Sequence, residues 1–480
     1  MSFENLIDGQ WSAASAMSVN RNPSDTSDVV GEFAQASAAE AESAVQAAAA
    51  ALPAWASTTG QQRGEILDRA GSELLARSAE LGDLLAREEG KTLLEASAEV
   101  ARAGQILKFH AGEAVRNAGV LIDSVRPSVE VSVSREPVGV VSVITPWNFP
   151  IAIPAWKIAP ALAYGNAVVF KPAELVPASA WHLVDVLRRA GLPAGVLNLV
   201  MGRGRDIGGV LTGAAQVDAV SFTGSGATGR RVLASAQEHL ARVQLEMGGK
   251  NPLVVLDDAD LDLAVEHALQ GAFGSTGQRC TASSRLVVTV GIHDEFVEAL
   301  VRRMRALVVG DARDPETQMG PVVDQSQLDQ DLRYLNLAVS EGAELHGGQR
   351  ISRSAEGFYL APALLVGTNN QHTVNREEVF GPVASVIRVG DYDEALAVAN
   401  DTSFGLTAGI ITRSLAAAHD FRRRSTAGMV MVNVATAGVD FHVPFGGMGA
   451  SSYGPREQGA AAREFFTRSK TSYVAAGLVG

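Results

Sequence analysis

A single cysteine stands out among the residues that could do chemistry. Cys280 lies in the segment GSTGQRCTASS, residues 274 to 284, and its neighbours are small and polar instead of Leu, Ile and Val. A structural cysteine usually behaves as a small hydrophobe inside an apolar element, whereas the run before Cys280 is typical of a turn. A reactive thiol and a packing residue are therefore both open interpretations of this position.

A glycine-rich segment could bind phosphate. SFTGSGATGRR, residues 221 to 231, places Gly224, Gly226 and Gly229 in a G-x-G-x-x-G pattern between a predicted strand and a predicted helix, which is the context of a dinucleotide-binding fingerprint. The fingerprint also needs an acidic residue about 20 positions further on, and Glu246 lies close to there. However, Glu246 is followed by the turn-like MGGK, which predicts a turn there instead of the end of a second strand. A glycine-rich turn without a ligand is the alternative.

Two further loops carry polar groups that could reach a ligand. KPAE, residues 171 to 174, places Lys171 and Glu174 at the end of a predicted strand, where open α/β sheets bind ligands and where both could reach ribose hydroxyls. TPWNFP, residues 145 to 150, holds Asn148 between two prolines, which would keep its neutral N–H donor aimed at a developing oxyanion. A solvated strand end and an ordinary loop are the respective alternatives.

Together these groups predict one site that oxidises an aldehyde. A Cys280 thiolate would attack the carbonyl carbon, while Asn148 and a backbone N–H hold the oxyanion. The thiohemiacetal would then lose hydride to a nicotinamide, and a carboxylate such as Glu246 would activate the water that hydrolyses the thioester. The thiol matters because an aldehyde hydrate is hard to oxidise directly.

Composition narrows the class of protein. The chain has 480 residues, of which 46% are hydrophobic and 19% charged, so it can build a large core. Its net charge of -13 argues against nucleic acid or an anionic membrane surface as a partner. One cysteine allows no internal disulfide, and no secretory signal is apparent, which favours the cytoplasm. The uncharged stretch 137 to 156 is interrupted by four prolines, which favours a buried strand and loop over a membrane span.

The elements that must position these residues follow from hydrophobic periodicity. The first third of the chain is predicted to be mostly helical, over 36–52 and 61–115. Beyond it, short apolar strands alternate with helical stretches, which predicts an α/β fold with parallel sheets covered on both faces. Two α/β halves would join near Gly248 and Gly249. The predicted strands include 128–136, 138–144, 166–172, 195–202, 217–225, 284–290, 384–389, 408–412 and 428–433, with a further strand starting at 251.

The chain resembles a known family. TPWNFP, FKPAE, SFTGSGATGR, LEMGGKNP, GQRC and EEVFGPV, in that order, are similar to the motifs of the NAD(P)-dependent aldehyde dehydrogenase superfamily. The resemblance implies a subunit of three parts, with a Rossmann-type NAD(P)-binding domain over 1–120 and 137–248 and an α/β catalytic domain over 249–463. A small β-hairpin arm, 121–136 with 464–480, would build homodimers or homotetramers.

The resemblance also implies residue roles. Cys280 would be the nucleophile, Glu246 the general base, and Asn148 with the Cys280 backbone N–H the oxyanion hole. Lys171 and Glu174 would bind the adenosine ribose, which leaves Glu246 free for catalysis. The other residues expected to bind the cofactor, at its pyrophosphate or nicotinamide end, are Gly224, Ser225, Gly229, Trp147, Glu378 and Phe380.

The substrate is less closely defined. AGVDFHVPFGGMGASSYGPREQG, residues 437 to 459, resembles the α-ketoglutaric semialdehyde (2,5-dioxopentanoate) dehydrogenases, although Gly449 stands where such sequences usually carry a lysine. Arg279 could bind the distal carboxylate of such a semialdehyde, or turn away into a salt bridge. Trp156, Phe149 and Phe441 could instead line a pocket for an aromatic or aliphatic aldehyde, or belong to the core. The arginine of many succinic semialdehyde dehydrogenases is not evident near Trp156.

Cofactor choice and class of activity have alternatives of their own. Glu174 would accept hydrogen bonds from ribose hydroxyls and repel a 2′-phosphate, which favours NAD, although Lys171 could still accommodate NADP. A cysteine hydrolase would need a histidine near Cys280, and the sequence does not place one of its nine there. An inactive binding protein is disfavoured because Cys280, Glu246 and Asn148 occur together. No metal site is predicted, since no ligand spacing is evident.

Overall fold

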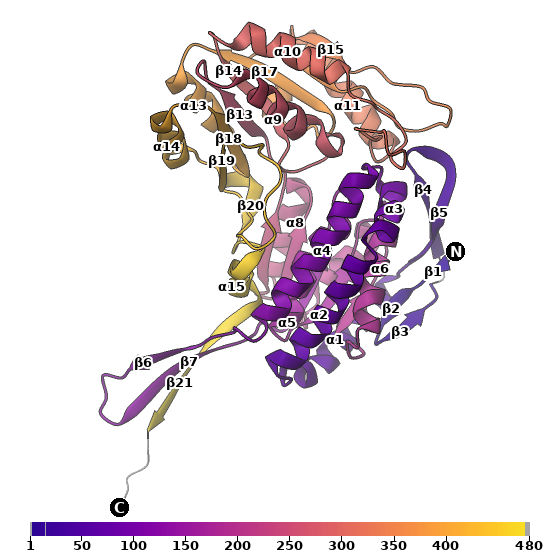
Figure 1. Ribbon diagram of the computed structural model, residues 1–480. Coiled ribbons are helices and arrows are strands. Elements are labelled where there is room, and N and C mark those ends of the chain that lie inside the picture. Colours follow the sequence, from indigo (N-terminus) through magenta and orange to yellow (C-terminus); the bar gives the residue numbers. More distant parts are fainter. Residues whose placement is uncertain (1, 15, 476–480) are drawn as a thin grey trace, which may run out of the picture.

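Most strands of the chain assemble into two large sheets (Figure 1). The structure is a computed structural model that describes residues 2–14 and 16–475. The first sheet has eight strands, in the order β20 (Ser452–Tyr453), β12 (Arg242–Glu246), β11 (Ala219–Thr223), β8 (Val140–Ile144), β9 (Ala167–Lys171), β10 (Leu197–Leu199), β2 (Asn5–Ile7) and β3 (Gln10–Ser12). The second has seven, in the order β15 (Glu344–Gly347), β16 (Ala363–Thr368), β17 (Val383–Val389), β14 (Ser283–Thr289), β13 (Asn251–Val255), β18 (Thr407–Ile411) and β19 (Met429–Val432).

The five central strands of the first sheet are parallel and fix where a ligand can bind. From β8 the chain runs outward through β9 and β10 on one side, and then returns to β11 and β12 on the other. The connections are α5 (Ala152–Ala163), α6 (Pro177–Arg189), α7 (Gly204–Gly213) and α8 (Gly226–Gln237). The strand order therefore reverses between β8 and β11, and open α/β sheets bind ligands at the carboxyl ends of the strands beside such a reversal.

The second sheet is parallel apart from its edge strand β15. The chain enters it directly after Glu246, the last residue of β12, through the segment 247–250. Its helices are α9 (Leu261–Phe273), α10 (His293–Arg305), α11 (Gln325–Ser340), α12 (Thr373–Arg376), α13 (Tyr392–Asn400) and α14 (Leu415–Arg424). The predicted α/β alternation and the predicted junction near Gly248 are thus seen in the strand pairing, while the exact domain boundaries stay predictions.

The N-terminal third differs from its prediction. The described residues before α1, 2–14 and 16–35, fell in the third expected to be mostly helical but form strands, and β1 (Ser2–Phe3), β5 (Asp25–Gln35) and β4 (Ala16–Asn22) make a small sheet of their own. The predicted helices do follow, as α1 (Ala38–Ala56), α2 (Gly60–Ala76), α3 (Ser78–Glu89) and α4 (Leu93–Glu113). Capping boxes begin α1, α2 and α4. The side chains of Ser37, Thr59 and Thr92 each accept a hydrogen bond from the backbone N–H three residues on, and their own backbone N–H groups donate to the side chain of that residue.

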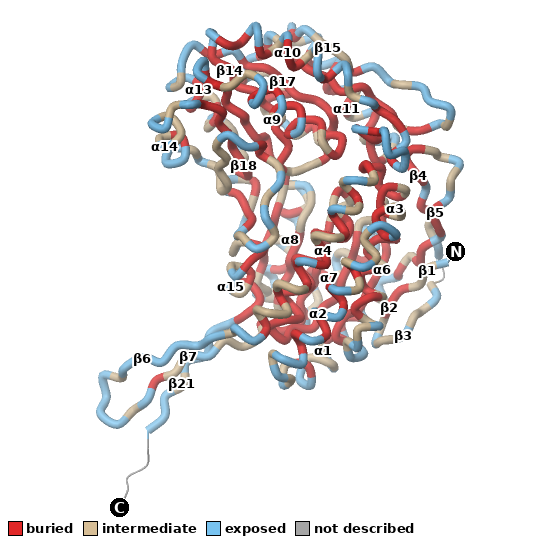
Figure 2. The backbone as a smooth tube through the Cα atoms, viewed as in Figure 1, coloured by how far each residue is buried: buried red, intermediate tan, exposed pale blue. Residues whose placement is uncertain are grey.

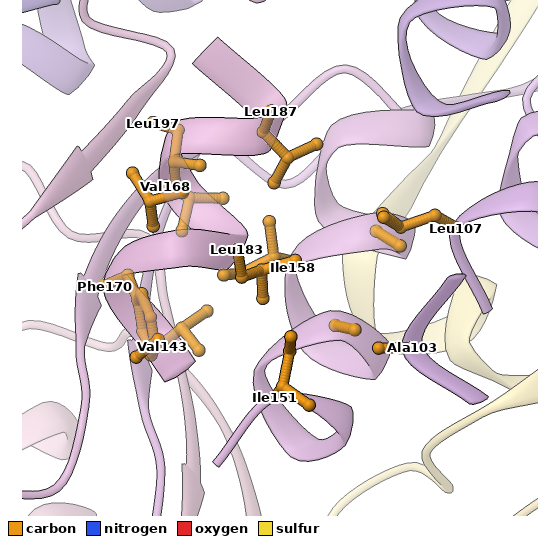
Figure 3. Packing of buried hydrophobic residues seen from close by; sticks show 14 of the residues in the cluster. Ala103, Leu107, Val143, Ile151, Ile158, Val168, Phe170, Leu183, Leu187 and Leu197 are labelled. Atoms are coloured by element: carbon orange, nitrogen blue, oxygen red, sulfur yellow. The ribbon is translucent and has the colours of Figure 1, made fainter. Parts of the chain in front are cut away.

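Helix α4 has two faces that serve different purposes. Its inner face joins the main core, where Leu107 packs with Ile158 of α5 and Leu183 of α6, all fully buried (Figure 3). Its other face, from Glu95 to Gln105, is polar and lines a cavity. The apolar face therefore fixes the helix against α5 by hydrophobic burial, and this packing holds the polar face in place.

A three-stranded arm projects from the body of the molecule (Figure 1). It consists of β6 (Val120–Asp123), β7 (Val129–Pro137) and β21 (Thr467–Ala475), with β7 in the middle and all pairs antiparallel. Most of its residues are exposed (Figure 2). The predicted arm also included 476–480, which lie outside the described residues. None of the described helices is long and apolar enough to cross a membrane.

Candidate active site

Cys280 lies on a tight loop between α9 and β14. Just before it, Ser275 and Thr276 adopt positive φ angles of 48° and 56°, a conformation that is unfavourable for a β-branched residue and often found at functional sites. Asn251 at the start of β13 donates from Nδ2 to the Cys280 carbonyl at 2.8 Å. The loop places the partly exposed Cys280 side chain on the wall of a cavity of about 530 Å³.

The surroundings of Cys280 favour the protonated thiol. Burial raises the pKa of the thiol to about 12, and the carboxyl groups of Glu378 and Glu246 add to this effect. Hydrogen bonds from the backbone N–H groups of Cys280 and Thr281 act in the opposite direction. A nearby base must therefore remove the proton before the sulfur can act as a nucleophile.

Asn148 lies beside the chain segment that leads to Cys280. It is buried in the loop after β8 and donates from Nδ2 to the carbonyl of Gln278 at 3.0 Å. The backbone carbonyl of Asn148 accepts a hydrogen bond from Lys91 Nζ at 2.7 Å. One hydrogen of the amide thus fixes the side chain, and a primary amide carries a second hydrogen that can be donated to an oxyanion.

Glu246 approaches from the first sheet. It is the last residue of β12, so the interpretation that Glu246 does not end a strand was wrong: the MGGK turn follows the strand instead of replacing its end. The side chain is buried, and Oε2 accepts a hydrogen bond from Ser452 Oγ at 2.5 Å. Burial and the neighbouring Glu457 carboxyl raise its pKa well above the usual value. A carboxylate in such a site is a stronger base than one in water.

Glu457 organises a buried cluster behind Glu246, which the sequence analysis missed. Its Oε2 accepts a hydrogen bond from Trp156 Nε1 at 2.6 Å, and its Oε1 pairs with Lys157 Nζ. Lys157 also donates to Ser221 Oγ at 2.9 Å. Removal of one partner would leave an uncompensated buried charge, which is strongly destabilising. Adjacent aromatic and basic residues in α5 were the available signal, but only the fold brings them to Glu457.

The predicted ribose-binding residues, Lys171 and Glu174, lie at the carboxyl end of β9. This strand is the outer neighbour of β8, beside which the strand order reverses. Lys171 ends β9, and burial lowers the pKa of its ammonium group while Glu174 raises it. Glu174 is exposed and accepts a hydrogen bond on Oε1 from the backbone N–H of Gly204, the first residue of α7. An acidic residue in this position is what the dinucleotide-binding rule requires for a ribose. The G-x-G-x-x-G pattern instead follows β11, on the other side of the reversal.

The glycine-rich turn begins α8. Ser225 is the N-cap and accepts a hydrogen bond from Thr228 N, and no atom lies within 4 Å of a Cβ placed on Gly226. This open helix N-terminus suits a phosphate group. Gly224 lies directly before the cap. Gly229 lies against the turn that follows β12, since a Cβ there would come within 2.6 Å of Met247 Sδ.

The remaining predicted cofactor residues gather beside Cys280. Glu378 Oε1 accepts a hydrogen bond from Gly249 N at 2.8 Å, and burial raises the pKa of this carboxyl to about 7. Phe380 has a φ of 64°, and its ring meets that of Trp147 edge-on with centroids 5.4 Å apart. The structure therefore brings the loops after β8, β11 and β12 together with the segment 378–380. These contacts fit a dinucleotide held between the two sheets.

The four residues predicted to contact the substrate all line the cavity at Cys280. Phe149, Trp156 and Phe441 line it, as does Arg279. Arg279 pairs with Glu95 of α4, with 2.8 Å between Nη2 and Oε1, so the salt bridge left open by the sequence is present. Arg102 of α4 also lines this cavity and was missed by the sequence analysis.

None of the residues that line the cavity is a histidine, and no group of three or more His, Cys, Asp or Glu in the described part of the chain could hold a metal ion.

Comparisons with known proteins agree with this geometry. The model of the aldehyde dehydrogenase family matches residues 11–472. The chain is 43% identical over 477 residues to the α-ketoglutaric semialdehyde dehydrogenase of Bacillus subtilis, with 98% of each chain covered. It is 42% identical over 476 residues to the α-ketoglutarate semialdehyde dehydrogenase of Haloferax volcanii, again with 98% of each covered.

Solved structures give the same result. The betaine aldehyde dehydrogenase of Staphylococcus aureus, solved in complex with NAD+, is 32% identical and superposes with a TM-score of 0.96, covering 99% of this chain and 96% of that one. The predicted resemblance and the predicted fold class are thereby confirmed. The chain belongs to the aldehyde dehydrogenase family of NAD(P)-dependent oxidoreductases.

Proposed function

We propose that this protein oxidises α-ketoglutaric semialdehyde to 2-oxoglutarate with NAD, through a covalent intermediate on Cys280. The observation that carries the proposal is the position of Cys280 on the wall of a cavity of about 530 Å³, with the carboxyl groups of Glu246, at the end of β12, and Glu378, in the segment before β17, acting on its thiol. The choice of semialdehyde is supported by the two relatives at 43% and 42% identity that are named for that substrate.

The chain's own residues account for the acyl chemistry. A neighbouring carboxylate, Glu246 or Glu378, takes the proton of the Cys280 thiol. The sulfur then bonds to the aldehyde carbon as the C=O π bond breaks, and the oxygen becomes an oxyanion that Asn148 Nδ2 and the Cys280 backbone N–H stabilise. Trp147, Glu378 and Phe380 would hold the nicotinamide end of NAD, which would accept the hydride that leaves the aldehyde carbon as the C=O bond re-forms and a thioester results. Glu246 then takes a proton from water, which attacks the thioester carbon, and the C–S bond breaks to release the carboxylate and the thiolate.

The residues at the strand ends favour NAD over NADP. Glu174 lies exposed at the end of β9 and would accept hydrogen bonds from both ribose hydroxyls. A 2′-phosphate in the same place would be repelled by this carboxylate. Lys171 is buried and donates to the carbonyl of Pro172 at 3.0 Å, and the nearby Glu174 carboxylate offsets its charge.

The exposed apolar residues of the arm support the proposal that the protein forms a homodimer or a homotetramer. Val120, Leu121 and Ile122 of β6 are exposed by 58%, 75% and 53%. Consecutive exposed apolar residues on a projecting strand are expected to be covered by another copy of the chain.

Initial rates of NADH and NADPH formation test the substrate and the cofactor together. The aldehydes are α-ketoglutaric semialdehyde, succinic semialdehyde, hexanal, benzaldehyde and betaine aldehyde, with Cys280→Ala as the inactive control. We expect the highest kcat/KM for α-ketoglutaric semialdehyde with NAD. A higher value for hexanal or benzaldehyde would favour the alternative that Phe149, Trp156 and Phe441 select an apolar aldehyde, and would overturn the proposed substrate.

A further inference from the structure

The charged residues around the cavity are mostly paired with one another. Along α4 and the segment before it, Lys91, Glu95, Glu99 and Arg102 face the cavity at helical spacing. Lys91 Nζ lies 2.7 Å from Glu99 Oε2, and the other Glu99 oxygen accepts hydrogen bonds from two backbone N–H groups at the start of α5. Glu95 holds Arg279. Lys91, Glu99, Glu95 and Arg279 thus each have a partner of opposite charge.

Arg102 differs from them. Among the described residues it forms no ion pair, and its one hydrogen bond runs from Nη2 to Gln458 Oε1 at a long 3.4 Å. Its Nε is buried and has no acceptor in the described part of the chain. The Nε2 donor of the fully buried Gln458 likewise has none. Arg102 and Gln458 are therefore joined by one hydrogen bond, and each has an N–H donor without an acceptor. Arg102 itself lines the cavity that holds Cys280.

Unsatisfied donors in a buried position call for an acceptor, since leaving them unpaired costs free energy. Burial already lowers the pKa of the Arg102 guanidinium, with Glu99 and Asp440 acting in the opposite direction. A carboxylate is the acceptor that matches a guanidinium, because its two oxygens can accept two parallel N–H bonds.

The charge of the cavity agrees with such an acceptor. Its lining carries three cations, Lys91, Arg102 and Arg279, and three carboxylates, Glu95, Glu99 and the exposed Asp440. Glu99 and Glu95 are paired with Lys91 and Arg279. Arg102 is therefore the cation of the lining that a substrate carboxylate could pair with, whereas a trimethylammonium group would be repelled by it.

We propose that Arg102 binds the carboxylate at the far end of the semialdehyde from the reacting carbonyl, and thereby selects an aldehyde that carries a carboxylate. This inference rests on the proposed function, in which that aldehyde is α-ketoglutaric semialdehyde. Arg279, the arginine adjacent to the nucleophile, stays paired with Glu95 and does not take this role.

Three variants test the inference. Arg102→Met keeps the length of the side chain and removes the charge, and Arg102→Lys keeps the charge and removes the fork. Arg116→Met is the matched control, because the Arg116 side chain is 68% exposed and pairs with Glu113 at the end of α4. Each is assayed with α-ketoglutaric semialdehyde and with pentanal, which has the same number of carbons and no carboxylate.

For Arg102→Met we expect kcat/KM for the semialdehyde to fall about 50-fold, mainly through KM, while pentanal changes by less than about threefold. The kcat/KM of Arg102→Lys for the semialdehyde should lie between those of the wild type and Arg102→Met. Arg116→Met should match the wild type on both aldehydes. An equal loss on both aldehydes, or no loss on the semialdehyde, would overturn the assignment even if the wild type prefers the semialdehyde.

Inhibition by 2-oxoglutarate separates this inference from the proposed function. With pentanal as substrate, the wild type should be inhibited competitively, and Arg102→Met should need at least about tenfold more inhibitor. This result supports the carboxylate site even if the semialdehyde proves a poor substrate, in which case the proposed function alone fails. Equal inhibition of both proteins would overturn the site.

Discussion

Arg279 donates a hydrogen bond from Nη2 to Glu95 Oε1 at 2.8 Å, which ties the residue before the nucleophile to the first turn of α4. The same Glu95 oxygen accepts the backbone N–H of Ser275 at 2.7 Å. One carboxylate thus holds two points of the loop that carries Cys280. The arrangement makes Arg279 a residue that positions the loop.

Replacement of Arg279 by Ala should therefore lower activity without changing selectivity. We expect kcat/KM to fall about tenfold for both α-ketoglutaric semialdehyde and pentanal, because the loop loses an anchor near the reacting atoms. Steady-state rates with the two aldehydes check this. A loss confined to the semialdehyde would instead make Arg279 the carboxylate partner.

Glu174 should control the choice of cofactor. In Glu174→Ala we expect KM for NAD to rise about tenfold, because two hydrogen bonds to the ribose are lost, and KM for NADP to stay equal or fall. The measurement is the ratio of kcat/KM for the two cofactors at saturating aldehyde. Glu238→Ala, at the exposed end of α8, is the control. An unchanged ratio in Glu174→Ala would remove Glu174 from the ribose site.

Asp331 of α11 should make stability depend on pH. It is fully buried, accepts a hydrogen bond from Gln327 on Oδ1, and has no partner in the described residues for Oδ2, which faces Gly381. Burial raises its pKa to about 8. Between the ordinary value of 3.8 and this one, the folded state holds a proton that the unfolded state has lost, so stability falls as pH rises.

Asp331→Asn removes that titration while keeping an acceptor for Gln327. Relative to the wild type, the variant should gain stability from pH 5 to pH 8, by at most about 1.4 kcal/mol per pH unit. Chemical denaturation at several pH values measures this gain, and Asp329→Asn on the exposed side of α11 is the control. A constant difference across this range would show that Asp331 does not titrate there.

The residues with distinctive chemistry could be predicted from the sequence, because their types and local patterns are unusual. A cysteine in a polar turn, an asparagine between prolines and a G-x-G-x-x-G between strand and helix are all local signals. The alternation of strands and helices likewise predicted the parallel sheets.

What depends on strand order could not be predicted in this way. The glycine pattern follows β11, the fourth parallel strand of its sheet in chain order, whereas Glu174 follows β9, the second. Only this order shows why the acidic residue for the ribose is not the one about 20 positions after the glycines. The short N-terminal strands were missed because their many polar residues obscure the alternation of apolar and polar positions that indicates a strand.

Arg102 was missed for a related reason. On a helix with charged residues on one face, an arginine is most simply solvated, and nothing local distinguishes it from Arg116. Its unpaired donors become visible only once α4, the nucleophile loop and the segment around Gln458 are assembled.

The most direct test of the covalent mechanism uses Glu246→Gln. The variant is mixed with α-ketoglutaric semialdehyde and NAD, quenched in acid, and digested for mass measurement. We expect a burst of NADH equivalent to the enzyme concentration, slow turnover afterwards, and an acyl group on the peptide that contains Cys280, because hydrolysis of the thioester lacks its base. Steady turnover at the wild-type rate with an unmodified Cys280 peptide would contradict the roles of both residues.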